Sequence, residues 1–358
     1  MKNMVYHSLF DTIVAQDPTF RAGFDRQKYQ GTLDGVLTET DRALCSGDRE
    51  AHAVDLALHA PRIIRAFVDY KIQHPSREDI ELLLRDAIEL GLDVYRGDSS
   101  AIERIRELKK RAKKSGNGEV LTRTLKQPSD LVTWNATHPS RSKRTAGDLI
   151  TRANGEDVLF VALAHGGVAA GMDAYLRYCD EVKSEGSEFY VARFSTQKLG
   201  DLIPKLSPTE IAYLQELALG RQPVIFDEDR ASGKTLDRAQ QFFTSTVFPF
   251  GRVVTLTNLD ARAELMSLGF GKKLLDMDKF GLGDKEKHSY ISDLYSKEII
   301  KKNNYNSLNE IIIEKDPYKD KIYFSKKKGP LEGFYSILSP SSLRSEELVG
   351  AKGKKGLF

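Results

Sequence analysis

Two acidic residues, Asp227 and Glu228, stand between a short apolar run and a small polar turn. The apolar run, residues 224–226, is typical of a strand that is buried on both faces of a sheet. The two acids would then lie at the carboxyl end of this strand, where open α/β sheets bind ligands. Carboxylates at such a place suit hydroxyl groups or a hard divalent cation.

The turn that follows the acids has the sequence Ala-Ser-Gly-Lys-Thr, residues 231–235. Its backbone N–H groups would stand at the start of a helix, which favours a bound phosphate. A Walker A loop is excluded, because that motif needs a glycine at the position that Glu228 occupies. Acids for hydroxyl groups and a phosphate loop a few residues away together predict a ligand such as a ribose 5-phosphate.

This order of features resembles the motif with which type I phosphoribosyltransferases bind 5-phosphoribosyl 1-pyrophosphate (PRPP). The resemblance covers roughly residues 150–285. It implies that Asp227 and Glu228 are catalytic residues that hold the ribose 2′ and 3′ hydroxyls. They would contact the cofactor Mg²⁺ indirectly, through these hydroxyls or water. The residues implied to bind the 5′-phosphate are Ala231, Ser232, Gly233, Lys234 and Thr235, of which Lys234 would supply charge or point to solvent.

A second turn with adjacent glycines precedes this motif. The apolar run 158–164 is followed by His165, Gly166 and Gly167, and then by an alanine-rich helix. Two adjacent glycines let an anion approach the backbone closely. The resemblance implies that this turn binds pyrophosphate, with Arg193 as a further contact. The residues alone leave open a solvent-exposed loop histidine at 165 and a surface salt bridge at 193.

The resemblance implies transfer of 5-phosphoribose from PRPP to a small nitrogen-containing acceptor, with release of pyrophosphate, as in nucleotide metabolism. Ala231 stands where the enzymes for 6-oxopurines usually carry an aspartate, which disfavours hypoxanthine and guanine. The acceptor is not identified by the sequence. In this family a variable hood recognises it, and residues 120–150 or 258–300 are the candidates for that hood.

Two other functions stay open. Polar residues, Asp229 and Arg230, stand where the family usually has an apolar residue, and Glu228 replaces a more frequent aspartate. These departures fit a non-catalytic regulatory protein that senses PRPP or a nucleotide and uses its helical domain to contact a partner. A third hypothesis is an enzyme of other chemistry on a related sheet, one that transfers phosphate or modifies ribose.

The elements expected around these motifs define an α/β fold. Strands are predicted at 158–164, 189–194, 224–226 and 252–257, and helices at 168–183, 208–219 and 234–243. Their alternation predicts a mostly parallel sheet with flanking helices. Ser207, Pro208 and Glu210 form a good helix start. The segment 195–206 is either a lid over the site or an ordinary surface loop.

Four regions are expected along the chain: an all-helical domain at 1–115, a connector at 116–150, the phosphoribosyltransferase-like domain at 151–285 and a lysine-rich extension at 286–358. Capping signals at Ser76 and Ser100 start two of the N-terminal helices, and Gly91 is the expected end of the first. Trp134 is expected to pack in the core, with an aromatic wall for a base as the alternative. In the extension, 311–313 and 322–324 predict a hairpin, and the tail is expected to be partly disordered.

Composition limits the class of protein. The chain has 358 residues, of which 40% are hydrophobic and 29% charged, as in globular proteins. No apolar run is long enough to cross a membrane, and two cysteines make no disulfide framework, so the expected location is cytoplasmic without a membrane partner. A net charge of +3 does not indicate nucleic acid and does not exclude it. The basic run 109–114 is expected to be a solvated helix end, with a polyanion contact as the alternative. A homodimer is compatible with the fold.

Overall fold

The computed structural model describes residues 5–75, 77–196, 200–230 and 234–260, and the backbone of three strands at 311–316, 321–326 and 335–337. The chain divides into two compact units, Met1–Leu259 and Asp260–Phe358. The first unit contains all the predicted site residues.

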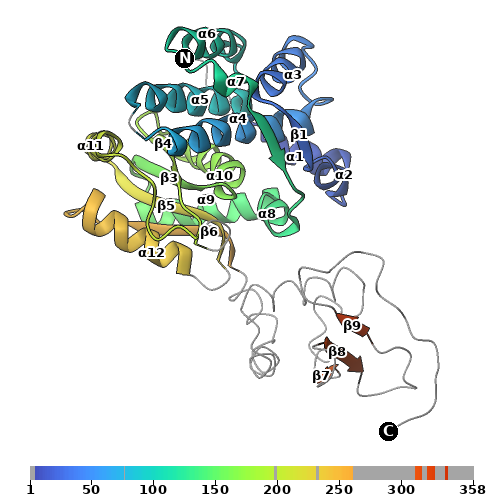
Figure 1. Ribbon diagram of the computed structural model, residues 1–358. Coiled ribbons are helices and arrows are strands. Elements are labelled where there is room, and N and C mark those ends of the chain that lie inside the picture. The colour runs from blue at the N-terminus through green and yellow to red at the C-terminus, as the bar shows by residue number, and fades with distance from the viewer. Residues whose placement is uncertain are drawn as a thin grey trace. The chain divides into compact units, whose positions relative to one another are not determined.

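A four-stranded sheet in the order β4-β3-β5-β6 forms the centre of the first unit (Figure 1). β3 pairs in parallel with both of its neighbours. From β3 the chain continues to β4 on one side and then to β5 on the other, so the strand order reverses between β3 and β5. Such a reversal is the place where open α/β sheets bind ligands. The strands are β3 (Val158–Ala164), β4 (Glu188–Arg193), β5 (Gln222–Arg230) and β6 (Val254–Asp260).

Helices cover both faces of this sheet. α10 (Gly167–Val182) packs against β3 and β5, and α12 (Lys234–Phe242) packs against β5. Figure 1 shows these two helices on opposite sides of the sheet. All residues of β3 are buried as a result, which explains its unbroken apolar sequence. The predicted α/β class with a largely parallel sheet and flanking helices is confirmed.

The helix after β4 begins as its sequence predicts. α11 (Pro208–Leu217) starts with a capping box, in which the Glu210 backbone N–H donates to Ser207 Oγ at 3.1 Å. The Ser207 N–H in turn donates to Glu210 Oε2 at 2.9 Å. Beyond α12 the chain makes one π-helical turn, η1 (Phe243–Val247), before β6.

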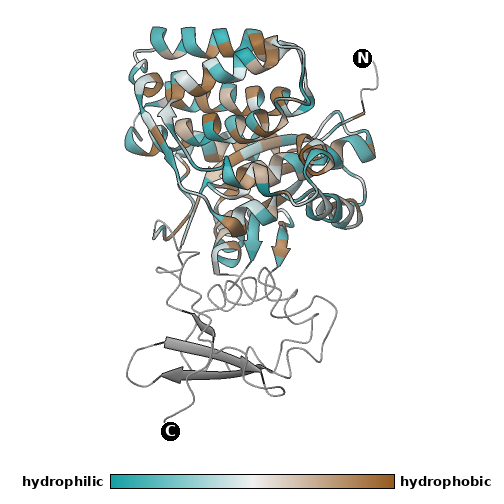
Figure 2. Cartoon of the chain, turned by 90° about the vertical axis from the view of Figure 1, so that its right-hand side faces the viewer, coloured by the Kyte–Doolittle hydropathy of each residue, from teal (hydrophilic) through white to brown (hydrophobic). Residues whose placement is uncertain are grey.

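The N-terminal helices share one core with the sheet. α4 packs against α1, α3, α5 and α10 and also contacts β4, so its surface is buried on nearly all sides. Hydrophilic residues lie mainly on the outward faces of the outer helices (Figure 2). The helices are α1 (Leu9–Gln16), α2 (Arg21–Asp25), α3 (Leu33–Cys45), α4 (Ala53–Gln73), α5 (Glu78–Arg96) and α6 (Ser100–Lys114).

The predicted end of α5 at Gly91 is wrong. The helix continues to Arg96 and ends at Gly97, whose φ of 75° lies in the left-handed region that favours glycine. A Cβ atom at Gly91 would stand 2.7 Å from Ile64 Cδ1 of α4. Gly91 therefore allows two helices to approach closely instead of ending one of them. The capping residue expected at Ser76 lies outside the described residues.

Residues 116–150 are more regular than a connector. They contain α7 (Glu119–Thr122), β2 (Thr124–Gln127), α8 (Leu131–Ala136) and most of α9 (Pro139–Ala153). β2 pairs in antiparallel fashion with β1 (Tyr29–Thr32). Trp134 is buried, its ring stacks on Phe20 with centroids 4.3 Å apart, and its Nε1 donates to the Phe20 carbonyl. The packing interpretation of this tryptophan is confirmed.

The basic end of α6 is solvated as predicted, because Lys110, Arg111, Lys113 and Lys114 are exposed. Lys109 Nζ lies 2.9 Å from an Asp34 carboxylate oxygen, and Arg111 reaches Asp86 at the same distance. In the second unit, β7 (Ile311–Asp316) and β8 (Lys321–Lys326) form the predicted antiparallel hairpin, and β9 (Tyr335–Ile337) pairs with β8. The boundary expected at 285 and the C-terminal tail lie outside the described residues. Within the described ranges, no helix has the length and apolar character needed to span a membrane.

Candidate functional site

The ends of β3 and β5 bring two of the predicted motifs together. His165 and Gly166 follow β3 directly, after a cis peptide bond between Ala164 and His165. Asp227 and Glu228 belong to the last part of β5, which is longer than predicted. A Cβ atom at Gly166 would overlap the Glu228 carboxylate. A glycine at this position is therefore what lets the acid lie directly against the turn after β3.

The acid pair is crowded by negative charge. The Asp227 carboxylate accepts a hydrogen bond from the Glu228 N–H at 3.1 Å, and Glu228 Oε1 lies 3.4 Å from Thr133 Oγ1. Burial raises the pKa of Asp227 well above its ordinary value, and the neighbouring charges of Glu228 and Asp229 raise it further. The site thus has a surplus of negative charge, which a cation or hydroxyl donors from a ligand would relieve.

The end of β3 is held by a carboxylate from the helical region. Asp69 Oδ1, on α4, lies 2.7 Å from His165 Nε2 and also accepts a hydrogen bond from Arg193 at 2.6 Å. Burial would raise the pKa of Asp69, but His165, Arg193 and Arg123 outweigh it and lower that pKa below its ordinary value. The two predicted pyrophosphate contacts therefore meet on one acid. Arg193 makes an ion pair, as the alternative interpretation held, but its side chain is only 12% exposed.

The predicted phosphate loop is described only at its end. Ala231, Ser232 and Gly233 lie outside the described residues, and their binding of the 5′-phosphate stays a prediction. Lys234 begins α12 at the predicted position. Thr235 Oγ1 makes a hydrogen bond of 2.6 Å with Thr196 Oγ1. This bond links the start of α12 to the segment after β4.

The segment after β4 was predicted to be either a lid or a surface loop. Its described part is attached at both ends, because the Ser195 N–H donates to Asp201 Oδ2 at 3.0 Å and the Lys205 N–H donates to the Arg193 carbonyl at 2.8 Å. Between these attachments Leu202 is 76% exposed. Both interpretations remain predictions.

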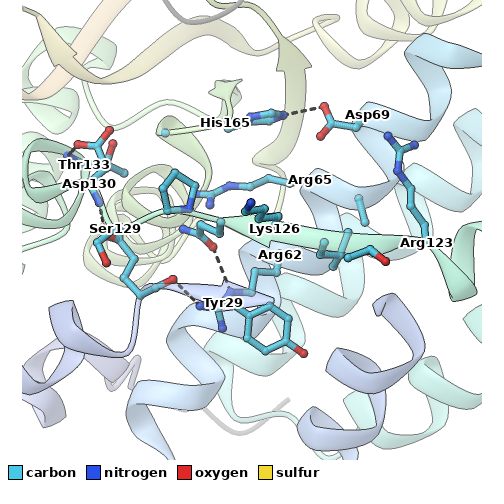
Figure 3. Close-up of a pocket in the computed structure, with 17 residues that line it drawn as sticks. Tyr29, Arg62, Arg65, Asp69, Arg123, Lys126, Ser129, Asp130, Thr133 and His165 are labelled. Carbon is cyan, nitrogen blue, oxygen red and sulfur yellow. Dashed lines mark hydrogen bonds and ion pairs between the residues drawn. The ribbon is translucent and has the colours of Figure 1, made fainter. Parts of the chain in front are cut away.

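A cavity of about 470 Å³ opens beside the turn after β3 (Figure 3). One wall is a face of α4, a second is the β1–β2 ribbon and the segment after it, and His165 and Gly166 form one edge. The segment 123–133, which forms part of this wall, falls within residues 120–150, one of the two regions predicted as candidates for the acceptor-binding hood. The charged residues that line the cavity are Arg62, Arg65, Asp69, Arg123, Lys126 and Asp130.

The contribution of α4 to this cavity is not among the predictions from the sequence. Positions 62, 65 and 69 lie about one helical turn apart and share one face. The available signal was a row of charged residues at helical spacing inside an otherwise apolar helix, since such residues are rarely buried without a partner. The sequence alone gives no reason to place that face against the turn at residue 165.

Arg62 connects two walls of the cavity by hydrogen bonds. Its guanidinium donates to the Gln127 side chain at 3.0 Å and to the Gln27 carbonyl at 2.8 Å, which ties α4 to β2. It also faces His59 Nδ1 at 3.1 Å. A guanidinium can only donate, so this nitrogen must be unprotonated. Burial, together with the charge of Arg62, accordingly lowers the pKa of His59 to about 4.

The acid pair fits a partial role in holding Mg²⁺. No group of three or more potential metal ligands occurs among the residues that the structure describes. Mg²⁺ is commonly held by one or two carboxylates together with oxygens of a phosphorylated substrate. Asp227 and Glu228, with their surplus of negative charge, match that pattern better than a complete protein-made site.

Comparisons of the chain with protein-family models, with curated proteins and with solved structures found no match.

Proposed function

We propose that this protein is a phosphoribosyltransferase that transfers 5-phosphoribose from PRPP to a nitrogen acceptor and releases pyrophosphate. The observation that supports this most is the contact between Glu228 and Gly166 at the reversal of strand order. It joins a glycine turn suited to an anion with an acid pair suited to ribose hydroxyls. The start of α12 lies a few residues beyond the acids, where a phosphate would be received.

In the proposed reaction, the bond from ribose C1 to a pyrophosphate oxygen breaks and a bond from C1 to the acceptor nitrogen forms. Pyrophosphate leaves with the electron pair, and the acceptor loses a proton. Positive charge grows on the ribose ring, and the carboxylates of Asp227 and Glu228 would stabilise it. His165 and Arg193, oriented by Asp69, would face the leaving pyrophosphate. Mg²⁺, when bound, would neutralise pyrophosphate charge and ease its departure.

The proposal is tested by calorimetric titration of the full chain with PRPP and Mg²⁺. We expect micromolar affinity for the wild type and a loss of at least about 100-fold in an Asp227→Asn, Glu228→Gln double variant, since two hydrogen bonds to charged groups are lost. The control is Asp25→Asn with Glu103→Gln, two carboxylates that are 59% and 66% exposed on the helical region. Equal affinity in both double variants would contradict the assignment of the site.

Pyrophosphate release separates catalysis from sensing. A regulatory protein that binds PRPP without turnover is the second candidate, and it is favoured by the polar Asp229 and Arg230 after the acid pair. Release of pyrophosphate in the presence of nitrogen heterocycles or amines would establish the enzyme. Tight binding of PRPP without release would favour the sensor, and no binding by the wild type would contradict both functions.

A further inference from the structure

The cavity beside the turn after β3 has more positive than negative charge to offer a ligand. Both of its acids are already engaged: Asp69 binds His165 and Arg193, and the side chain of Asp130 accepts from the Thr133 N–H at the start of α8. Of the four basic residues, Arg62 already donates its hydrogen bonds to the Gln127 side chain and the Gln27 carbonyl. Three cationic side chains remain, namely Arg65, Arg123 and Lys126.

No hydrogen bond or ion pair reaches these three side chains from the residues that the structure describes. Arg65 is the most deeply placed, and its Nε is shut off from solvent without an acceptor. A buried donor of this kind is costly unless a partner arrives. Burial lowers the pKa of Arg65, and among the charges that oppose this effect Glu228 contributes most. Arg65 thus lines the cavity and also senses the charge of Glu228 in the acid pair.

The position of the three cations suits a ligand that enters from the β2 side. Arg123 is half-buried and Lys126 is exposed, so they line the outer part of the cavity, whereas Arg65 extends from α4 across its middle (Figure 3). The volume of about 470 Å³ is that of a small-molecule site. His165 and Gly166 take up only one edge of it, which leaves the space around Arg65 for a second molecule.

We propose that this cavity receives the acceptor, and that the acceptor carries a carboxylate or phosphate group bound by Arg65, with Arg123 and Lys126 adding positive charge at the entrance. The identification of the ligand as the acceptor rests on the proposed function, whereas the anion site is inferred from the cavity alone. A guanidinium binds either group in bidentate fashion. The acceptor nitrogen would then point from the cavity toward the acid pair.

The test uses matched anionic and neutral probes. Nicotinate is compared with nicotinamide, and phenyl phosphate with phenol, by calorimetric titration of the full chain. Ribose 5-phosphate and Mg²⁺-pyrophosphate are present at saturation, so that the PRPP site is filled without reaction. We expect at least one anion to bind at least about tenfold more tightly than its neutral counterpart, and Arg65→Gln to remove this preference. The pair that shows the preference distinguishes carboxylate from phosphate.

The control is Arg106→Gln, which removes a guanidinium that is 64% exposed on α6 and should change nothing. Arg123→Gln, at the entrance, should weaken anion binding by about threefold to tenfold and guards against misfolding of the Arg65 variant. Equal affinity for anionic and neutral probes, no binding of any probe, or unchanged binding in Arg65→Gln would overturn the inference. So would an anion preference that appears only when pyrophosphate is left out, because the cavity would then belong to the leaving group.

The two proposals fail in distinguishable ways. Loss of PRPP binding in the Asp227→Asn, Glu228→Gln variant with no anion preference in the cavity would leave the proposed function standing and overturn the acceptor site. An anion preference that depends on Arg65, in a wild type that binds no PRPP, would establish the anion site and contradict the phosphoribosyltransferase.

Discussion

The ends of β3 and β5 touch each other but differ in their charges: opposite charges are paired at one end, and like charges are adjacent at the other. At the end of β3, His165 and Arg193 meet the carboxylate of Asp69, and opposite charges are paired without any ligand. At the end of β5, Asp227 is followed by two further acids, and burial and like charge raise its pKa. Both ends are half-buried, so burial alone does not explain the difference. The sign of the neighbouring charges stabilises the ion pairs at the end of β3 and leaves the acids at the end of β5 without compensation for their mutual repulsion.

Gly166→Ala should have the largest effect, because it moves the Glu228 carboxylate away from the turn after β3. The new Cβ would overlap the Glu228 carboxylate, and a flexible acid can swing away at little cost to the fold. We expect PRPP affinity to fall by about 30- to 100-fold, or about 2–3 kcal/mol, with a nearly unchanged melting temperature. Calorimetry and thermal melts measure the two quantities.

Gly147→Ala on α9 is the matched control, since nothing lies within 4 Å of the Cβ it would carry. Unchanged PRPP affinity in Gly166→Ala would mean that the contact between the two ends has no part in binding.

Asp69→Asn tests the paired end and should have an intermediate effect. The neutral amide leaves His165 and Arg193 without their shared anion, and we expect a loss of about 1–2 kcal/mol in the free energy of unfolding. The pKa of Asp69 is lowered in the folded state, so its contribution exists above the unfolded pKa and disappears as the pH falls through the folded pKa. The difference between variant and wild type should therefore shrink in acid, which denaturant titrations at pH 7 and pH 3 would measure.

Asp55→Asn provides the control on the same helix. Asp55 pairs with Arg26 at the surface, where an ion pair contributes about 0–1 kcal/mol. An equal loss of stability in the two variants would show that the end of β3 is no more than another surface ion pair.

Asp227→Asn should have the smallest effect, and it should be stabilising. The pKa of this acid is raised in the folded state, so its contribution is fully present below the unfolded pKa of about 3.9 and is lost as the pH rises through the folded pKa. At pH 8 the variant should melt about 2–4 °C above the wild type, which corresponds to about 1 kcal/mol. The gap should close toward pH 4.

Asp237→Asn, in a carboxylate that is 63% exposed at the start of α12, is the matched control. A variant at residue 227 that is less stable than the wild type at pH 8 would contradict the account of the crowded acids.

Local sequence was enough to predict the limits of an element where the residues of that segment alone determine them. The run at β3 was predicted with the correct limits because its apolar residues are bounded by polar ones on both sides, and α11 and α12 began at the predicted residues. β5 is longer than predicted and continues to Arg230. This extension was missed because hydropathy does not show where a strand continues into polar residues.

Features that depend on two distant segments were not predictable in this way. Gly91 resembles a helix end in the sequence, and only the approach of Ile64 explains its place inside α5. The hydrogen bond between Asp69 and His165 joins residues nearly a hundred positions apart, and no local sequence pattern predicts it. The cavity was missed for the same reason, since its walls come from α4, the β1–β2 ribbon and the turn after β3.

The placement of α4 has a consequence for how the molecule could change over time. One face of this helix supplies Ile64 and Phe67 to the core shared with the sheet, and another supplies Arg65 and Asp69 to the cavity. Recombination that exchanged the N-terminal helices for another module would remove core residues and cavity-lining residues in one event. Point substitutions on the cavity face of α4 or in the ribbon opposite it would instead change the cavity lining and leave the shared core in place.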